Sequence, residues 1–278
     1  MSREIIQRYK ILAKKSLGQN FLVNEEITTQ ISQLVEVAWK NIVEVGPGYW
    51  ALTEKLLHQK PASLHLVELD RDMIEILEDR FMQPSPPAPL PEGEGSFQIY
   101  NQDILEFVPE FQGYSVIANI PYYITSPILR HFLYDLENKP EHMIILMQKD
   151  VGDKIIGGKK DKTSVIRLLV EKRYKVSEKL FVPPESFSPS PKVDSSVLLF
   201  EKHDSFQDVD DHSFLEIIKI WFSSNRKKLI KNLVTGWYEK EKIIWFFQEN
   251  DILEMVRWED LSIGIWVKLV SYLIDKEK

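Results

Sequence analysis

The chain contains no cysteine, and this absence excludes several kinds of chemistry at once. Without thiols there is no disulfide, no thiolate nucleophile and no cysteine-bound zinc. The six histidines are scattered along the sequence and lack the paired spacing of metal ligands on one helix. We therefore expect no metal site.

Long apolar segments are also missing. No run approaches the length that crosses a bilayer, and the first ten residues lack the unbroken apolar stretch of a signal peptide. We expect a cytoplasmic protein with no membrane partner, and we expect a monomer. The 278 residues, 44% of them hydrophobic, are enough for one large domain or two moderate ones.

Positive charge is in the minority, and the net charge of −7 by itself argues against a polyanionic partner. The basic residues are nevertheless clustered within residues 1–20, 154–175 and 223–232, and the last cluster contains Arg226, Lys227 and Lys228. Any single cluster can be a solvated helix face. Three clusters in an acidic chain favour a surface that binds nucleic-acid phosphates.

Strand-like and helix-like segments alternate over the first 200 residues. Apolar and β-branched runs predict strands at residues 42–45, 64–69, 97–100, 115–118, 143–147, 174–181 and 195–200. Helical spacing of apolar residues predicts helices at 25–39, 52–59, 71–81, 127–136 and 149–156. This order is typical of an α/β fold with a parallel sheet that helices cover on both faces.

After residue 200 the pattern predicts helices alone, at 213–223, 226–234, 240–250 and 265–274. We place the boundary in the acidic linker 203–211, which gives a first domain of residues 1–202 and a small helical domain of residues 203–278. Residues 83–95 hold five prolines and two glycines and predict an exposed connection without regular structure.

The motif Asn119-Ile120-Pro121-Tyr122 follows the strand-like run 115–118 directly. Pro121 keeps Ile120 extended and prevents a helix, so the Asn119 side-chain oxygen and backbone carbonyls are exposed at the carboxyl end of a strand. Two such acceptors can hold both hydrogens of an exocyclic amine, and Tyr122 offers a flat face on which a base can stack. Taken alone, the motif fits a strand-ending turn equally well.

The ends of the preceding strands carry residues suited to an adenosine-containing ligand. Gly46 and Gly48 allow close approach of the backbone, and Glu68 follows at about the twenty-residue distance at which an acid binds a ribose diol. Asp103 can accept a hydrogen bond from an adenine amine. A nicotinamide dehydrogenase is the alternative, because residues 46–51 also fit a dinucleotide-binding turn. Binding of S-adenosylmethionine or of NAD distinguishes the two.

Seven blocks of sequence resemble, in the same order, the ribosomal RNA adenine N6-dimethyltransferases. The resemblance covers nearly the whole chain apart from the proline-rich residues 83–95. The blocks are KKSLGQNFL (14–22), EVGPG (44–48), ELD (68–70), QDI (102–104), NIPYY (119–123), MQKDV (147–151) and PPESFSPSPKVDS (183–195).

The resemblance implies a Rossmann-like class I methyltransferase sheet with a small C-terminal helical domain, and S-adenosylmethionine as methyl donor. The donor-binding residues that it implies are Gln19, Asn20, Leu22, Gly46, Gly48, Glu68, Leu69, Asp103, Ile104 and Asn119. The implied catalytic motif comprises Asn119, Ile120, Pro121 and Tyr122. Base and RNA contacts are expected from Tyr122, Phe187, Arg226, Lys227 and Lys228.

The substrate that the resemblance implies is a pair of adjacent adenosines in a hairpin loop near the 3′ end of small-subunit (16S) rRNA, within a pre-ribosomal particle. Two departures stand out. Trp50 replaces a frequent glycine and is expected to narrow the approach to the donor, and Ile120 replaces the usual leucine. The alternatives are a large-subunit (23S) rRNA methyltransferase of the macrolide-resistance type and a non-catalytic ribosome assembly factor.

Overall fold

The computed structural model describes residues 6, 8–9, 11–82, 96–157, 163–207, 209–222, 229–235 and 239–275. The chain divides into two units. The first comprises Met1–Gly152 and Val176–Lys202, and the second comprises Asp153–Lys175 and His203–Lys278. The proline-rich residues 83–95, for which we predict an exposed connection, lie outside the described residues.

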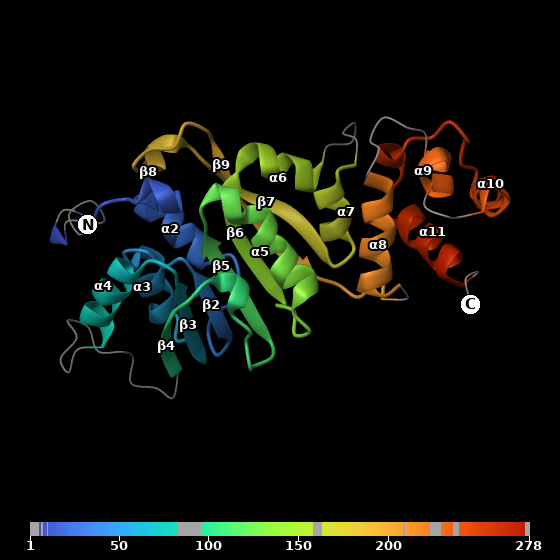
Figure 1. The fold of residues 1–278 in the computed structure, drawn as a ribbon. Coiled ribbons are helices and arrows are strands. Elements are labelled where there is room, and N and C mark those ends of the chain that lie inside the picture. The colour runs from blue at the N-terminus through green and yellow to red at the C-terminus, as the bar shows by residue number, and fades with distance from the viewer. Residues whose placement is uncertain are drawn as a thin grey trace. The chain divides into compact units, whose positions relative to one another are not determined.

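The first unit is built on a seven-stranded sheet (Figure 1). The strand order is β4 (Ser96–Asn101), β3 (Ser63–Glu68), β2 (Asn41–Val45), β5 (Tyr114–Asn119), β6 (His142–Gln148), β9 (Ser195–Lys202) and β7 (Tyr174–Val182). The first five strands run parallel, and β9 runs antiparallel to β6. The interiors of β2 and β5 are buried throughout, as expected of parallel strands covered on both faces. The α/β sheet that we predict is thus confirmed.

The path of the chain through this sheet creates a natural ligand site between β2 and β5. From β2 the chain moves outward to β3 and β4, and then it returns to β5 on the other side of β2. The register pairs Val45 with Ala118, so the residues that follow these two strands are neighbours. Open α/β sheets bind ligands at the carboxyl ends of their strands, at such a reversal of strand order.

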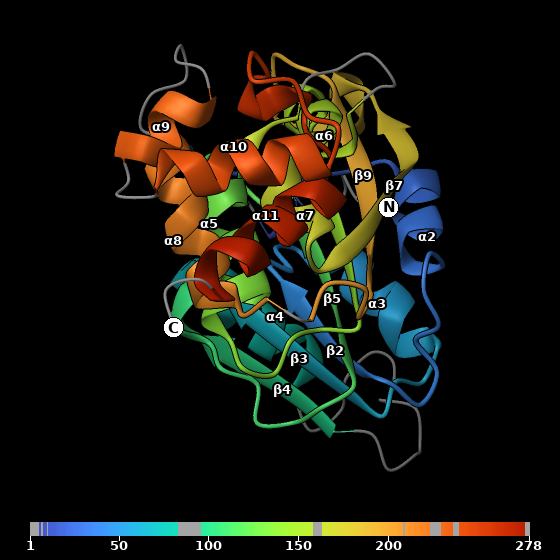
Figure 2. The same ribbon diagram turned by 90° about the vertical axis from the view of Figure 1, so that its right-hand side faces the viewer.

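Helices cover both faces of the sheet (Figure 2). On one face, α2 (Glu25–Ser32), α3 (Ala51–His58) and α4 (Arg71–Phe81) contribute apolar residues to a core cluster that also contains Ile42, Leu64 and Ile117. On the other face lies α5 (Thr125–Arg130), which a π-helix, His131–Asp135, continues. Helix α6 (Lys149–Ile156) follows β6.

Helix α2 is shorter than the predicted helix 25–39. The Asn24 side chain caps its first turn by accepting hydrogen bonds from the Glu26 and Ile27 amides, as we would expect of an N-cap asparagine. After Ser32 the chain turns toward β2, and Trp39 adopts a positive φ of 62°, which no α-helix allows. Leu34 and Val35, which lie beyond the end of α2, nevertheless pack against the same core cluster, and this explains why the apolar spacing continues in the sequence.

The second unit contains helices α7 (Val165–Glu171), α8 (Asp211–Phe222), α9 (Leu229–Thr235), α10 (Lys240–Glu249) and α11 (Ile263–Asp275). We did not predict α7, and our domain boundary leaves residues 153–175 in the first domain. In the structure Leu168 of α7 is buried in the apolar cluster of the second unit, and Lys172 and Arg173 bind the Asp211 carboxylate of α8. These contacts explain why this segment groups with the C-terminal helices.

Candidate active site

A pocket opens at the carboxyl ends of β2, β3, β4 and β5. One wall is formed by residues 17–22, and the others are formed by the turns that follow the strands. Among the residues that line it are Gln19, Asn20, Leu22, Gly46, Gly48, Glu68, Leu69, Asp103, Ile104, Asn119, Ile120, Pro121, Tyr122 and Phe187. The structure thus brings the predicted donor-binding and base-binding residues of this unit together, while their roles stay predictions.

The glycine turn after β2 forms the floor of the pocket. Gly46 and Gly48 have φ values of 65° and 54°, a left-handed conformation that favours glycine. A Cβ atom at Gly46 would lie 3.5 Å from the Asn119 carbonyl oxygen, so this turn touches the end of β5. A Cβ atom at Gly48 would lie 3.2 Å from the Phe21 ring. The turn therefore contacts both the Asn119 motif and the wall formed by residues 17–22.

Glu68 ends β3 and is buried beneath the pocket. Its Oε1 accepts a hydrogen bond from the Asp70 amide (2.8 Å), and its Oε2 accepts one from the Gly48 amide (3.3 Å). Burial raises the pKa of the Glu68 carboxyl above its usual value, although these amide bonds oppose the shift. Each oxygen keeps a second lone pair, so the carboxylate can still accept bonds from ribose hydroxyls.

Asp103 follows β4 and begins a short 3₁₀ helix, Ile104–Glu106. One of its carboxylate oxygens, Oδ1, accepts a hydrogen bond from the Leu105 amide (2.9 Å). Apolar surface beside it comes from Leu69 and Ile104, which also line the pocket. A polar acceptor between two aliphatic side chains suits a flat, largely apolar ring with one exocyclic amine.

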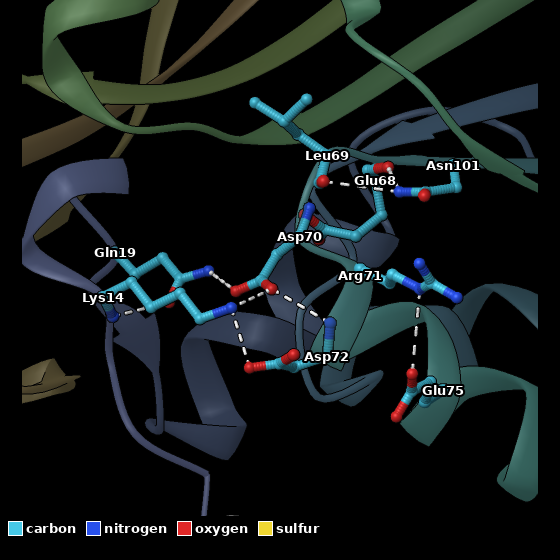
Figure 3. A network of polar contacts seen from close by, with 9 residues as sticks. All are labelled: Lys14, Gln19, Glu68, Leu69, Asp70, Arg71, Asp72, Glu75 and Asn101. Atoms are coloured by element: carbon cyan, nitrogen blue, oxygen red, sulfur yellow. Dashed lines mark hydrogen bonds and ion pairs between the residues drawn. The ribbon is translucent and has the colours of Figure 1, made fainter.

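Residues 14–22 form a wall segment that is fastened at several points. The Tyr49 hydroxyl donates a hydrogen bond to the Leu22 carbonyl oxygen. Strand β1 (Phe21–Leu22) pairs with β8 (Phe187–Ser188), a two-residue ladder too short for us to have predicted. Further back, Gln19 and Lys14 bind the Asp70 carboxylate (Figure 3). These contacts hold Asn20 and Leu22 at the pocket.

The Asn119 motif borders the pocket at the carboxyl end of β5. Ile120 is buried, and Pro121 leads into a 3₁₀ helix, Tyr122–Ile124. The Tyr122 hydroxyl lies 2.7 Å from Ser195 Oγ, and burial raises the pKa of this hydroxyl. Phe187 lines the pocket and is also buried in the core cluster, so the two interpretations of this aromatic residue, base contact and core packing, are compatible.

Among the pocket residues that we did not predict, two have properties that matter for the site. Tyr123 lines the pocket and is 63% exposed. Glu44 in β2 lines it as a buried acid, and its Oε2 has no hydrogen-bond partner within the part of the chain that the structure describes. Burial raises the pKa of Glu44 from 4.5 to about 8. The available signal was an acid inside the apolar run of a buried parallel strand.

Trp50 does not narrow the pocket, and this expectation was wrong. The residue adopts a φ of 64° directly before α3, and its indole is buried. It packs edge-on against Phe81 and Tyr9, with the Arg80 guanidinium 5.9 Å from its ring centre. The bulk that replaces the usual glycine is therefore accommodated by the core.

Within the described residues, the structure does not support the basic clusters as a phosphate-binding surface in the way that it brings the pocket residues together. Arg226, Lys227 and Lys228 lie outside the described residues. In the cluster 154–175, Lys172 is buried beside Asp211, Arg173 binds the same carboxylate, and Arg167 binds Glu171. We counted these side chains as a phosphate-binding surface, but they neutralise acids of their own unit. Lys14 of the first cluster is likewise bound to Asp70 and Asp72.

Over the described residues, no group of three or more histidine, aspartate or glutamate side chains is placed to hold a metal ion. Within the same part of the chain, no helix combines the length and apolar character needed to cross a membrane. The pocket instead offers carboxylates, a glycine turn and an amide next to aromatic rings. This set suits an adenosine-containing, positively charged ligand better than a metal.

Comparison with known proteins gives a consistent result. Residues 11–275 match the model of the family described as Ribosomal RNA adenine dimethylase. The chain is 34% identical to Ribosomal RNA small subunit methyltransferase A of Prochlorococcus marinus (strain MIT 9301), over 95% of this chain and 97% of that protein. It is 35% identical to the protein of the same name from Fusobacterium nucleatum, over 93% and 96%.

Two solved structures share the fold over most of their length. A dimethyladenosine transferase from Plasmodium falciparum has a TM-score of 0.75 at 22% identity, covering 92% of this chain and 97% of that one. The 23S rRNA methyltransferase ErmE has a TM-score of 0.71 at 18% identity, covering 92% and 100%. At these identities the comparison concerns the fold alone, which is that of class I rRNA methyltransferases.

Proposed function

Since the chain belongs to the ribosomal RNA adenine dimethylase family, we propose that it dimethylates N6 of two adjacent adenosines in a hairpin loop near the 3′ end of small-subunit rRNA. The family supports the coarser statement, an S-adenosylmethionine-dependent methyltransferase that acts on rRNA adenine. The hairpin, the small subunit and a pre-ribosomal particle as natural substrate, with a role in ribosome biogenesis, belong to the proposal.

The observation that carries this proposal is the contact between the glycine turn and the Asn119 motif. Gly46 and the Asn119 carbonyl group are neighbours, so a donor on the turn and an amine on the motif would meet. Two features favour the small-subunit branch: the curated relatives carry small-subunit names, and the sequences 17–22 and 222–228 resemble that branch.

The donor would be held by the side of the pocket nearest β3 and β4. Glu68 accepts the ribose hydroxyls, Asp103 accepts the adenine amine, and Gly46 and Gly48 let the backbone approach the amino-acid end. Gln19, Asn20 and Leu22 close the wall beside it. When bound, S-adenosylmethionine supplies an activated methyl group on a sulfonium.

The Asn119 motif would prepare the target amine for attack. An adenine N6 is a weak nucleophile because its lone pair is conjugated with the ring. In the first transfer, the Asn119 side-chain oxygen and the Ile120 carbonyl would each accept one of its hydrogens, which favours a pyramidal nitrogen whose lone pair points at the methyl group. As the N–CH₃ bond forms, the sulfonium would leave as a thioether and one N–H proton would pass to solvent, so a single N–H remains to be held in the second transfer. This stabilisation grows toward the transition state and requires no strong base. Tyr122 and Phe187 hold the base by stacking, at about 1–3 kcal/mol for each ring.

An unpaired loop adenosine suits this pocket, because little stacking energy is lost when its base turns outward. Arg226, Lys227 and Lys228 are proposed to bind the flanking phosphates, which predicts a steep loss of RNA affinity with salt. The exposed ring of Tyr123 at the pocket offers a further stacking surface for RNA.

The test is methylation of purified ribosomal subunits, with the modified bases mapped by mass spectrometry. We expect dimethylation of two adjacent adenosines in undermethylated small subunits and no methylation of large-subunit RNA. Modification of large-subunit RNA instead would move the chain to the macrolide-resistance type. Binding to immature small subunits without methyl transfer would indicate the assembly factor.

A further inference from the structure

Asp70 is not among the residues to which we have given a chemical role, yet its carboxylate accepts three hydrogen bonds. Its side chain is 1% exposed. Oδ1 accepts bonds from Lys14 Nζ (2.5 Å) and from the Asp72 amide (3.0 Å), and Oδ2 accepts one from Gln19 Nε2 (2.8 Å) (Figure 3). Burial alone would raise the pKa of Asp70, but the bonds from Lys14 and Gln19 outweigh it and lower the pKa below its usual value.

The two residues that reach Asp70 also close a loop with each other. The Lys14 amide donates to Gln19 Oε1 (2.8 Å), and the Gln19 amide donates to the Lys14 carbonyl oxygen (3.4 Å). Between them lies one turn of 3₁₀ helix, Lys15–Leu17. Both ends of the Gln19 side-chain amide are therefore bound by the protein itself. This changes our view of Gln19, which we predicted to contact the donor directly.

Asp70 also contacts the proposed ribose ligand, through its backbone amide. The Asp70 amide donates to Glu68 Oε1 (2.8 Å), and Glu68 is the proposed ribose ligand. Asp70 thus connects Glu68 with the wall segment that carries Asn20 and Leu22. Gly18, next to Gln19, packs against the motif side, because a Cβ atom there would lie 3.2 Å from the Tyr123 ring.

We infer that Asp70 is a positioning residue. Through Gln19 and Lys14 it holds residues 14–22 as a fixed wall of the donor site, and through its amide it keeps this wall at a fixed position relative to Glu68. The inference rests on the proposed function. Its consequence is that the wall is ordered before the donor arrives, so donor binding does not have to supply that ordering. Loss of the Asp70 contacts with Lys14 and Gln19 should weaken donor binding and leave the transfer step intact once the donor is bound.

The test compares Asp70→Asn with a matched control on the same helix. Asparagine keeps the shape and can still cap α4, whereas it loses the charge that Lys14 and Gln19 bind. The control is Glu75→Gln, which removes an exposed partner of Arg71 and does not contact the wall segment (Figure 3). We measure S-adenosylmethionine binding by calorimetry, steady-state kinetics with both substrates, and amide hydrogen exchange of residues 14–22 without ligand.

We expect Asp70→Asn to raise the Kd and KM for the donor about tenfold, to speed hydrogen exchange of residues 14–22, and to leave kcat at saturating donor within about twofold. The control should match the wild type. Gln19→Leu should act through the same contact. The double variant should therefore have a donor Kd no higher than that of the weaker-binding single variant. An unchanged donor Kd in Asp70→Asn, or additive effects in the double variant, would overturn the inference. A wild type that binds no donor would instead overturn the proposed function, and the inference with it.

Discussion

The two sides of the pocket differ in how far their polar groups are already used. On the donor side, both oxygens of Glu68 accept amide hydrogens, and Asp103 caps a 3₁₀ helix. On the target side, the Asn119 side-chain amide has no hydrogen-bond partner within the described residues. The difference indicates a preorganised donor site beside a motif whose hydrogen-bonding groups are left for an incoming base.

The strongest test of this difference is to remove the Asn119 side-chain amide. Asn119→Ala should lower kcat about 10³-fold, because one acceptor of the transition-state hydrogen bonds is lost, while the donor Kd changes less than about twofold. Single-turnover methylation and calorimetry measure the two quantities. Asn41→Ala, at the opposite end of the sheet with its amide bound to the Gln112 carbonyl oxygen, serves as control. Normal turnover of Asn119→Ala would refute the amine-holding role.

Glu44 is a polar group at the pocket whose Oε2 has no hydrogen-bond partner within the described residues, and its burial predicts a pH dependence of stability. Its pKa of about 8 in the folded state lies above the usual 4.5, so the folded state holds a proton that the unfolded state releases. The contribution is fully present below pH 4.5 and is lost as the pH rises to about 8, with a slope of about 1.4 kcal/mol per pH unit. Glu44→Gln should remove this slope from the free energy of unfolding. Denaturant titrations at several pH values measure it, and parallel profiles for the two proteins would contradict the prediction.

On the donor side, Glu68→Ala should weaken donor binding by about 10- to 100-fold, because the carboxylate that we propose as acceptor of the ribose hydroxyls is lost. The value of kcat at saturating donor should change little, which is the opposite of the result expected for Asn119. Calorimetry with S-adenosylmethionine measures the binding. An unaltered Kd would remove Glu68 from the ribose site.

The smallest effect on activity is expected from the hydrogen bond between the Tyr122 hydroxyl and Ser195 on the target side. Tyr122→Phe keeps the ring and loses only the hydroxyl contact with Ser195, so the KM for RNA should rise about threefold. Ser195→Ala breaks the same contact from the other side and should match it. Tyr122→Ala, which removes the stacking surface, should cost more than either. Equal effects of the Phe and Ala variants would argue against stacking.

Much of the first unit follows from its sequence, because strand ends are marked by short motifs. The apolar runs predict the strands. The parallel sheet then places Asn119, which directly follows one run, and Glu68, near the end of another, at the pocket edge. The fastening of the wall segment could not be predicted, since Asp70 meets Lys14 and Gln19 only through tertiary folding. Lys172 shows the same limit, because a basic residue in a charged stretch gives no indication of burial beside Asp211.

The pairing of Leu22 with Phe187 has a consequence for biosynthesis. The two partners lie near opposite ends of the first unit's sequence, so the ribosome must deliver almost all of that unit before they can meet. A nascent chain that stops at β6 has made the glycine turn and the Asn119 motif but still lacks the strand that secures Leu22. The cofactor site is therefore among the last features of this unit to be completed during translation.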